Sequence, residues 1–138
     1  MEEDLRNGIA KALSAEFGDR YKIYAQSIEQ GLRKPCFFII HKGTEYAYLP
    51  MNRCLVSFSF EVQAVLSEKK NGGISQEAER VLCALKRIDC GDGNLNAFDL
   101  KLSTVDGGFK AGVIYQMSAR FKEEAGELME KLEINEGE

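Results

Sequence analysis

The sequence predicts an α+β domain in which two amphipathic helices pack on one face of a mostly antiparallel sheet. Residues 3–17 and 77–88 each space apolar side chains along one helical stripe. Residues 53–64 alternate apolar and polar side chains, which is the pattern of a strand with one buried face. Residues 98–121 are interpreted as two more strands around a glycine turn. The expected order is therefore α-β-β-β-α-β-β.

The first helix is expected to end at Gly18, because glycine readily adopts the left-handed conformation that closes a helix. Acidic residues at its start suit the positive end of the helix dipole. Residues 21–25 alternate weakly and predict a short strand, and a polar turn follows over 27–34. The apolar stripe of this helix consists of Leu5, Ile9, Ala12, Leu13 and Phe17.

Pro35 has no N–H to donate, so it is expected to open the next strand or to lie at an edge. The apolar run over residues 36–41 has the length of a strand covered on both faces. The polar, tyrosine-bearing residues 42–50 are interpreted as a connection to the alternating strand.

The alternating strand has two faces of opposite chemistry. One face is apolar and the other polar, so the sequence predicts one buried face and one face open to water or to a partner. The apolar face consists of Cys54, Val56, Phe58, Phe60, Val62 and Ala64. The polar face consists of Ser57, Ser59, Glu61 and Gln63.

The second helix is expected to start at Ser75, which can cap its first turn, and to include Ile88 in its apolar stripe. Two long strands then close the domain, joined by Asp106-Gly107-Gly108. This turn supplies the positive φ angles of a tight hairpin.

Charge divides the chain into a domain over residues 1–122 and an acidic tail over 123–138. The tail holds seven Glu and one Lys, so the rest of the chain carries +2 of the total −4. A nearly neutral body disfavours general binding to nucleic acid, which requires a clustered basic face. The tail is expected to form a short helix or to fray.

The sequence offers no constellation typical of catalysis, so no cofactor is expected and an enzyme is the remote alternative. His41 is the single histidine, and no Ser or Cys lies at motif spacing from it. The four cysteines form no Cys-x-x-Cys pair, so no metal site is expected, and free thiols suit a reducing cytoplasm. The glycine-rich turns lack the Lys-Ser/Thr of a phosphate-binding loop.

A candidate subunit or partner interface is instead expected on strand surfaces and turns. Tyrosine is favoured at interfaces, although any single tyrosine here is also typical of a half-buried strand position. Basic residues beside a turn are likewise typical of a solvated loop. The candidates are Tyr46, Tyr48, Ser57, Ser59, Glu61, Arg33 and Lys34.

Several segments together resemble the tail terminator family of long-tailed phages and prophages. They are Glu-Phe-Gly-Asp at 16–19, Tyr-Lys-Ile-Tyr at 21–24, and Gln-Gly-Leu-x-x-Pro-Cys-Phe-Phe at 30–38, followed by the alternating strand, the second helix and the closing hairpin. The motif residues are Gln30, Gly31, Pro35, Cys36 and Phe37. The resemblance implies a small α+β subunit without catalytic residues.

The same resemblance implies a self-assembling ring, commonly of six copies, on the head-proximal end of the tail tube. The implied partners are the tail-tube protein and the head connector, with DNA only passing through the ring. The expected location is the host cytoplasm during assembly and then the virion, since the acidic start Met-Glu-Glu-Asp is unlike a signal peptide. The alternative is a small cytoplasmic module that binds a peptide or metabolite.

Overall fold

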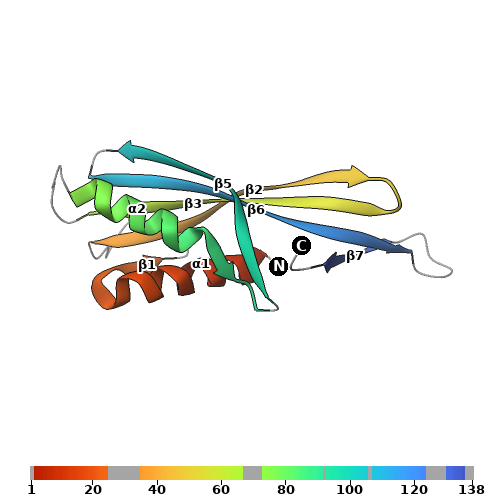
Figure 1. Cartoon of the computed structure of the whole chain (residues 1–138), viewed down its shortest axis with the longest axis horizontal. Helices are drawn as coiled ribbons and strands as arrows, with labels where there is room; N and C mark the ends of the chain where they lie inside the picture. Colours follow the sequence, from red (N-terminus) through yellow and green to blue (C-terminus); the bar gives the residue numbers. More distant parts are fainter. Residues whose placement is uncertain are drawn as a thin grey trace.

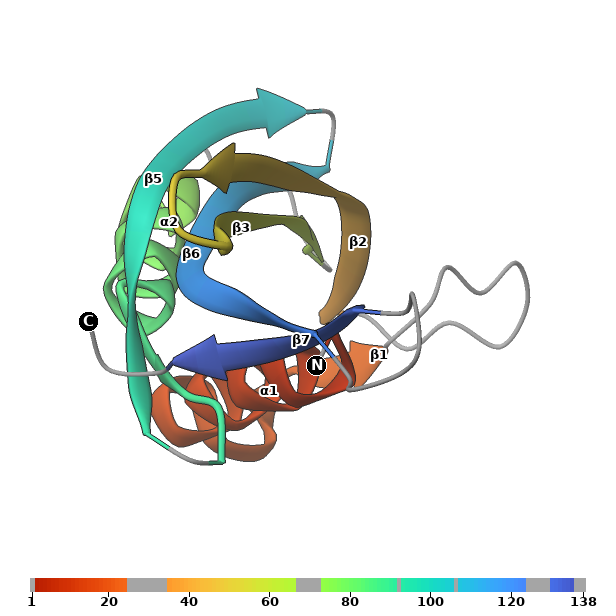
Figure 2. The same cartoon turned by 90° about the vertical axis from the view of Figure 1, so that its right-hand side faces the viewer.

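The computed structural model describes residues 2–24, 35–66, 73–91, 93–105, 107–123 and 130–135. These residues form a seven-stranded sheet with two helices against one of its faces (Figures 1 and 2). The helices are α1 (Glu2–Phe17) and α2 (Gly73–Leu85), and a short 3-10 helix, η1 (Gly18–Arg20), follows α1. The strands are β1 (Lys22–Tyr24), β2 (Cys36–Leu49), β3 (Arg53–Val65), β4 (Arg87–Asp89), β5 (Asn94–Val105), β6 (Gly108–Glu123) and β7 (Glu130–Asn135). The predicted α+β class is confirmed.

The strand order across the sheet is β1-β2-β3-β6-β5-β4, and β7 pairs with β6. Neighbouring strands are antiparallel except β1 and β2, which run parallel. β3 lies at the centre and pairs along its whole length with β2 on one side and β6 on the other. The sheet is strongly twisted, as Figure 2 shows.

The hydrophobic core lies between the helices and one face of the central strands. The predicted apolar face of β3 is buried throughout, whereas its polar face is only half-buried. The alternate residues of β6 share that buried face, because paired residues of antiparallel strands point to the same side. The helices contribute Leu5, Ile9, Leu13, Phe17, Ala78, Val81 and Leu85.

β2 is longer than the sequence predicts. Residues 42–49, interpreted above as a connection, continue the strand and pair with β3 up to Leu49 opposite Arg53. A register shift between His41 and Gly43 interrupts the alternation at this point, which hides the strand pattern in the sequence. The full length of β3 is available as a partner, so the ladder continues despite the polar composition.

The second helix starts and ends earlier than predicted: it begins at Gly73, so Ser75 lies within it and does not precede it, and Ile88 lies in β4 instead of the helical stripe. The hydroxyl of Tyr115 donates a hydrogen bond to the carbonyl of Leu85 at 2.6 Å. The N–H of Ala97 donates to the carbonyl of Lys86 at 2.8 Å. These bonds satisfy the carbonyls at the helix end, so the chain leaves the helix there and joins the sheet.

The described part of the acidic tail is a strand and not the short helix considered from the sequence. β7 pairs with residues 118–123 of β6. β5 stops pairing with β6 at Tyr115, which leaves that edge of β6 open beyond this point. An open edge offers unpaired N–H and C=O groups, which explains why these residues extend the sheet.

Helix α1 approaches β4 closely at Gly8. A Cβ atom added at Gly8 would overlap the carbonyl oxygen of Asp89, which is a backbone atom. The side chain of Asp89 strengthens the contact, since Oδ2 lies 3.1 Å from Nζ of Lys11. The N–H of Gly91 donates to Oδ1 of Asp89, and this bond lowers the pKa of the carboxyl.

We expect Gly8→Ala to destabilise the protein, although alanine is the better helix former. The added methyl must push α1 away from β4, and overpacking of this kind typically costs about 1–3 kcal/mol. Urea unfolding followed by circular dichroism measures the change. Gly112→Ala is the matched control, because a Cβ there meets no atom within 4 Å. Equal stability of the two variants would contradict the prediction.

We expect Tyr115→Phe to lower the free energy of unfolding by about 1–3 kcal/mol, because the buried carbonyl of Leu85 loses its partner. Burial also raises the pKa of Tyr115. The folded chain therefore holds this proton more tightly than the unfolded chain, and the stability it contributes is lost as pH rises above about 10. Unfolding curves between pH 8 and 11 should show a smaller alkaline loss in the variant, and parallel losses would contradict this.

Candidate functional site

Among the side chains that the structure describes, the large apolar ones that remain exposed lie at the margins of the sheet and at one hairpin tip. Among the residues that the structure describes, none of them lies on a helix. Three lie on β2, three on β5 and one in the turn between β2 and β3. They are Tyr46, Tyr48 and Leu49, then Phe98, Leu102 and Val105, and finally Met51. Contiguous exposed apolar surface commonly marks a site of protein contact.

The tip of the β2–β3 hairpin presents the most exposed of these side chains. Met51 is 85% exposed and Tyr48 is 75% exposed. Met51 and Asn52 both adopt positive φ angles, 66° and 57°, which turns the chain within three residues. Nε of Arg53 donates to the carbonyl of Pro50 at 3.1 Å and closes the turn. The tip is therefore an ordered projection that carries apolar side chains.

The two candidate tyrosines lie on the same face of the sheet as the core. Tyr46 pairs with Val56 and Tyr48 pairs with Cys54, and both partners are fully buried. Tyr46 is nevertheless 51% exposed, because β2 forms the margin of the sheet here. Both tyrosines thus extend the apolar face of the sheet beyond the enclosed core.

The candidate residues of β3 lie on the opposite face. Ser57, Ser59 and Glu61 are half-buried, on the side of the sheet away from the helices. The amide of Gln116 on β6 donates to Oγ of Ser57 at 3.0 Å, and Nε2 of Gln63 donates to Glu61 at 2.7 Å. These residues form the polar face of β3, on the side of the sheet opposite to Tyr46 and Tyr48.

The described part of the family-like motif is structural. Pro35 accepts a hydrogen bond from the N–H of Lys22 at 3.1 Å, which docks β1 beside β2. Cys36 and Phe37 are fully buried. The ring of Phe37 stacks on Tyr21, with 4.3 Å between centroids. The other motif residues, Gln30 and Gly31, and the interface candidates Arg33 and Lys34, lie outside the described residues.

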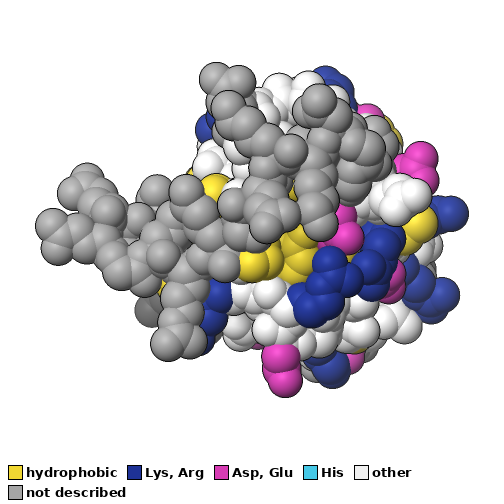
Figure 3. Space-filling view, turned by 90° about the vertical axis from the view of Figure 1, so that its left-hand side faces the viewer, with side chains coloured by type: hydrophobic (Ala, Val, Ile, Leu, Met, Phe, Trp, Pro, Cys, Tyr) yellow, Lys and Arg dark blue, Asp and Glu magenta, His cyan; other side chains and the backbone are white. Residues whose placement is uncertain are grey.

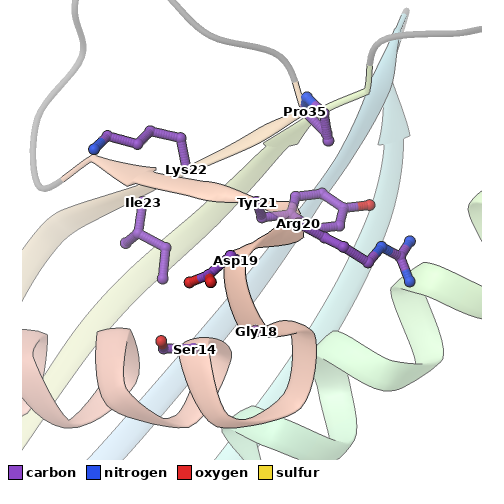
Figure 4. Close-up of a pocket in the computed structure, with 8 residues that line it drawn as sticks. All are labelled: Ser14, Gly18, Asp19, Arg20, Tyr21, Lys22, Ile23 and Pro35. Carbon is purple, nitrogen blue, oxygen red and sulfur yellow. The ribbon is translucent and has the colours of Figure 1, made fainter.

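A hollow of about 530 Å³ lies between the C-terminal end of α1 and β1 (Figure 4). Ser14, Asp19 and Ile23 point toward it, whereas the amine of Lys22 extends away. Figure 3 views this end of the molecule, where basic side chains gather beside apolar ones. The lining residues are Ser14, Gly18, Asp19, Arg20, Tyr21, Lys22, Ile23 and Pro35.

Side chains beside this hollow connect α1 to α2. The Tyr21 hydroxyl donates to Glu77 at 2.8 Å, and Arg20 lies 3.2 Å from the same carboxylate. Burial and the bond to Glu77 both raise the pKa of Tyr21. Arg80 reaches back to Glu16 at 3.0 Å and covers the ring of Phe17. The contacts described here join the two helices, which is a structural role.

The described residues contain no cluster of His, Cys, Asp and Glu that could hold a metal ion. The ring of His41 contacts Thr44 Oγ1 at 2.9 Å, Glu2 at 3.5 Å and the ring of Phe60. The cysteines are free thiols, and Cys83 is the exposed one. Neither α1 nor α2, the α-helices of the described residues, has the length and hydropathy of a membrane-spanning helix.

Comparison with known families shows to which family the chain belongs. A family model described as phage tail terminator protein matches residues 4–127. The chain belongs to this family. Its members are structural proteins of the phage tail, so the chain is a tail component that contacts other tail or head proteins. No curated protein matches the chain.

The family match extends from α1 to a position between β6 and β7. It therefore includes both margins of the sheet and the hairpin tip, whereas β7 lies beyond it. The resemblance inferred from the sequence is confirmed.

Sequence reasoning missed five of the seven large apolar residues that are exposed in the described part of the chain. Leu49 lies in the segment interpreted as a connection, Met51 directly follows that segment, and Phe98 and Leu102 follow the alternation expected of a buried face. A register shift between Ala97 and Asp99 turns Phe98 outward, to 65% exposure. The sequence carries no signal for the edge position of β5, so the exposure of Leu102 and Val105 was not predictable from it.

Proposed function

We propose that the protein caps the tail tube at its head-proximal end, stops tube polymerisation there and forms the surface that joins the head. The single observation that carries this proposal is the family match over residues 4–127. In this proposal the chain acts as a homo-oligomer, most simply a closed ring of six copies, encoded by a phage or prophage. Its partners are the tail-tube protein and the head connector, and DNA only passes through the ring.

The distribution of exposed apolar residues supports a subunit that binds other proteins. A closed ring requires two different contact surfaces on each copy, because each copy contacts one neighbour on each side. The apolar residues lie at opposite margins of the sheet, on β2 and on β5. The proposed life cycle begins with assembly in the host cytoplasm and ends in the virion.

A nearly neutral body also suits passage of DNA through a ring. Residues 1–122 carry +2 and the tail carries −6. Strongly basic walls would bind phosphates and slow DNA movement. The polar face of β3 is proposed as a further contact surface for a subunit or partner, through Ser57, Ser59 and Glu61.

The experiment that tests the proposal is the solution mass of the full chain by light scattering over a concentration series, with negative-stain imaging. We expect a species of about six copies with a ring shape, given closed cyclic symmetry. Co-assembly with isolated tail tubes is the second readout. A monomer that also fails to bind tail tubes would overturn the proposal.

We expect Ser57→Glu with Ser59→Glu to impair assembly and to spare folding. Two added carboxylates on a half-buried face repel a protein partner, whereas their positions lie outside the core. The oligomer fraction by light scattering measures assembly, and thermal unfolding checks the fold. Asn7→Glu with Ala15→Glu is the matched control, with the same added charge at exposed positions of α1. Normal assembly of the β3 variant would exclude this face as an interface.

We also propose that residues 1–122 fold as one domain without the acidic tail. The core residues of the described chain all lie between Leu5 and Ala119. Deleting residues 126–138 removes the β7 ladder and is expected to leave a cooperative thermal transition. Circular dichroism during heating measures this. A lost or broadened transition would make the tail part of the folding unit.

A further inference from the structure

Two margins of the sheet carry backbone that no described strand pairs. β1 pairs with β2 only at residues 36–38, and β4 pairs with β5 only at residues 94–96. Beyond those short ladders, the outer sides of residues 40–47 of β2 and 99–105 of β5 face no other described strand. Such edges are templates for pairing with another chain unless they are protected.

Neither margin is protected by shortness or by proline, although each strand contains one bulge, at His41/Gly43 in β2 and at Ala97/Asp99 in β5. Edge strands of monomeric proteins are commonly short, or interrupted by Pro or by inward-pointing charge. β2 and β5 have 14 and 12 residues, and neither contains proline. Six of the seven exposed large apolar side chains of the described residues lie on these two strands. The margins therefore resemble surfaces that another chain covers.

The directions of the two strands suit a second copy of the same chain. β2 is antiparallel to β3, β3 to β6 and β6 to β5, so β2 and β5 run in opposite directions. Rotation about an axis roughly along the strands preserves these directions. It brings β2 of one copy beside β5 of the next in antiparallel orientation, and every copy uses both margins.

We propose that the outer edge of β2 in one copy pairs with the outer edge of β5 in the next, so that the sheets of neighbouring subunits join. This inference rests on the proposed function as a self-assembling tail subunit, and it assigns the contact that holds the copies together.

Charge and side-chain chemistry fix a register. On the face away from the helices, the margin of β2 carries Glu45 and that of β5 carries Lys101, whose side chain is 81% exposed and lies 3.9 Å from Asp99 of the same strand. Pairing Glu45 with Lys101 of the next copy places opposite charges side by side. The same register places Tyr46 opposite Leu100 and Thr44 opposite Leu102, on the face that continues the core. Aromatic and aliphatic side chains then cover one another across the contact.

This register is compatible with closure into a ring. Within one copy Lys101 lies level with Ile40, through Gly112 and Glu61. Ile40 pairs with Glu61 and Glu45 pairs with Ser57, so the two residues lie four pairing positions apart along the strand. The register shift between His41 and Gly43 accounts for the fifth residue between them. Four residues along a strand span roughly 13 Å, and the four strand spacings from one copy to the next span roughly 19 Å. A shift of this ratio inclines the strands by about 35° to the axis of the ring. Closed sheets typically have inclinations of about 35–45°.

Chemical cross-linking between engineered cysteines tests the contact in the full-length chain. Glu45→Cys and Lys101→Cys are combined in a Cys83→Ser background, which removes the exposed native thiol. A short bis-maleimide is expected to give a ladder of covalent multimers on a denaturing gel, whereas either single variant alone gives no multimer. Ser57→Cys with Lys101→Cys is the matched control, because Ser57 lies one strand further from the margin.

A ladder no stronger than that of the control overturns the pairing. Dimers from Glu45→Cys alone would overturn it in favour of a two-fold contact between β2 edges. Rings of wild-type chain without the ladder reject this contact and leave the proposed function standing. A chain that stays monomeric and gives no ladder rejects the self-pairing, and binding to tail tubes then decides the proposed function separately.

Charge exchange tests the register itself. Glu45→Lys and Lys101→Glu each place like charges opposite one another and are expected to lower self-association several-fold, measured by light scattering. The double variant restores opposite charges in reversed order and is expected to recover wild-type association. Additive losses in the double variant would overturn the register.

Discussion

The structure depends above all on the two antiparallel ladders of β3. This strand pairs along its whole length with β2 on one side and β6 on the other, so its alternation fixes which residues of both neighbours face the core. A shift of one residue would turn every apolar side chain of β3 toward water. The six buried residues from Cys54 to Ala64 exclude that shift, and the register of β3 fixes the positions of β2 and β6 beside it.

The helices are attached to this sheet by a few close contacts. Gly8 lets α1 approach β4, Tyr115 binds the carbonyl at the end of α2, and Arg80 connects α2 to Glu16 and Phe17 of α1. Both helices cover the same face, so the opposite face keeps the polar side chains of β3 and the margins remain open. That asymmetry suits a subunit whose function is to contact other proteins. Most of the exposed apolar residues lie on β2 and β5, the strands at the two margins that the helices do not cover.

Much of the fold could be predicted from the sequence because it is encoded in local patterns. The helical stripe of α1, the alternation of β3 and the glycine turn before β6 each correspond to the observed element. The polar composition of residues 42–49 and the bulge beyond His41 concealed the second half of β2. In the same way, the early end of α2 depends on Tyr115, a partner 30 residues distant from Leu85 that no local pattern reveals.

The sequence by itself determined the fold class, the family and the polar and apolar faces of β3, because period and motif are properties of neighbouring residues. Only the tertiary structure decided which strands lie at the margins. Strand order follows from pairing between distant segments, so Leu102 appears in the sequence as a core residue and in the structure as an exposed edge residue. Tyr46 and Tyr48 were recognised as contact candidates, but their place beside the core face depended on the register with Val56 and Cys54.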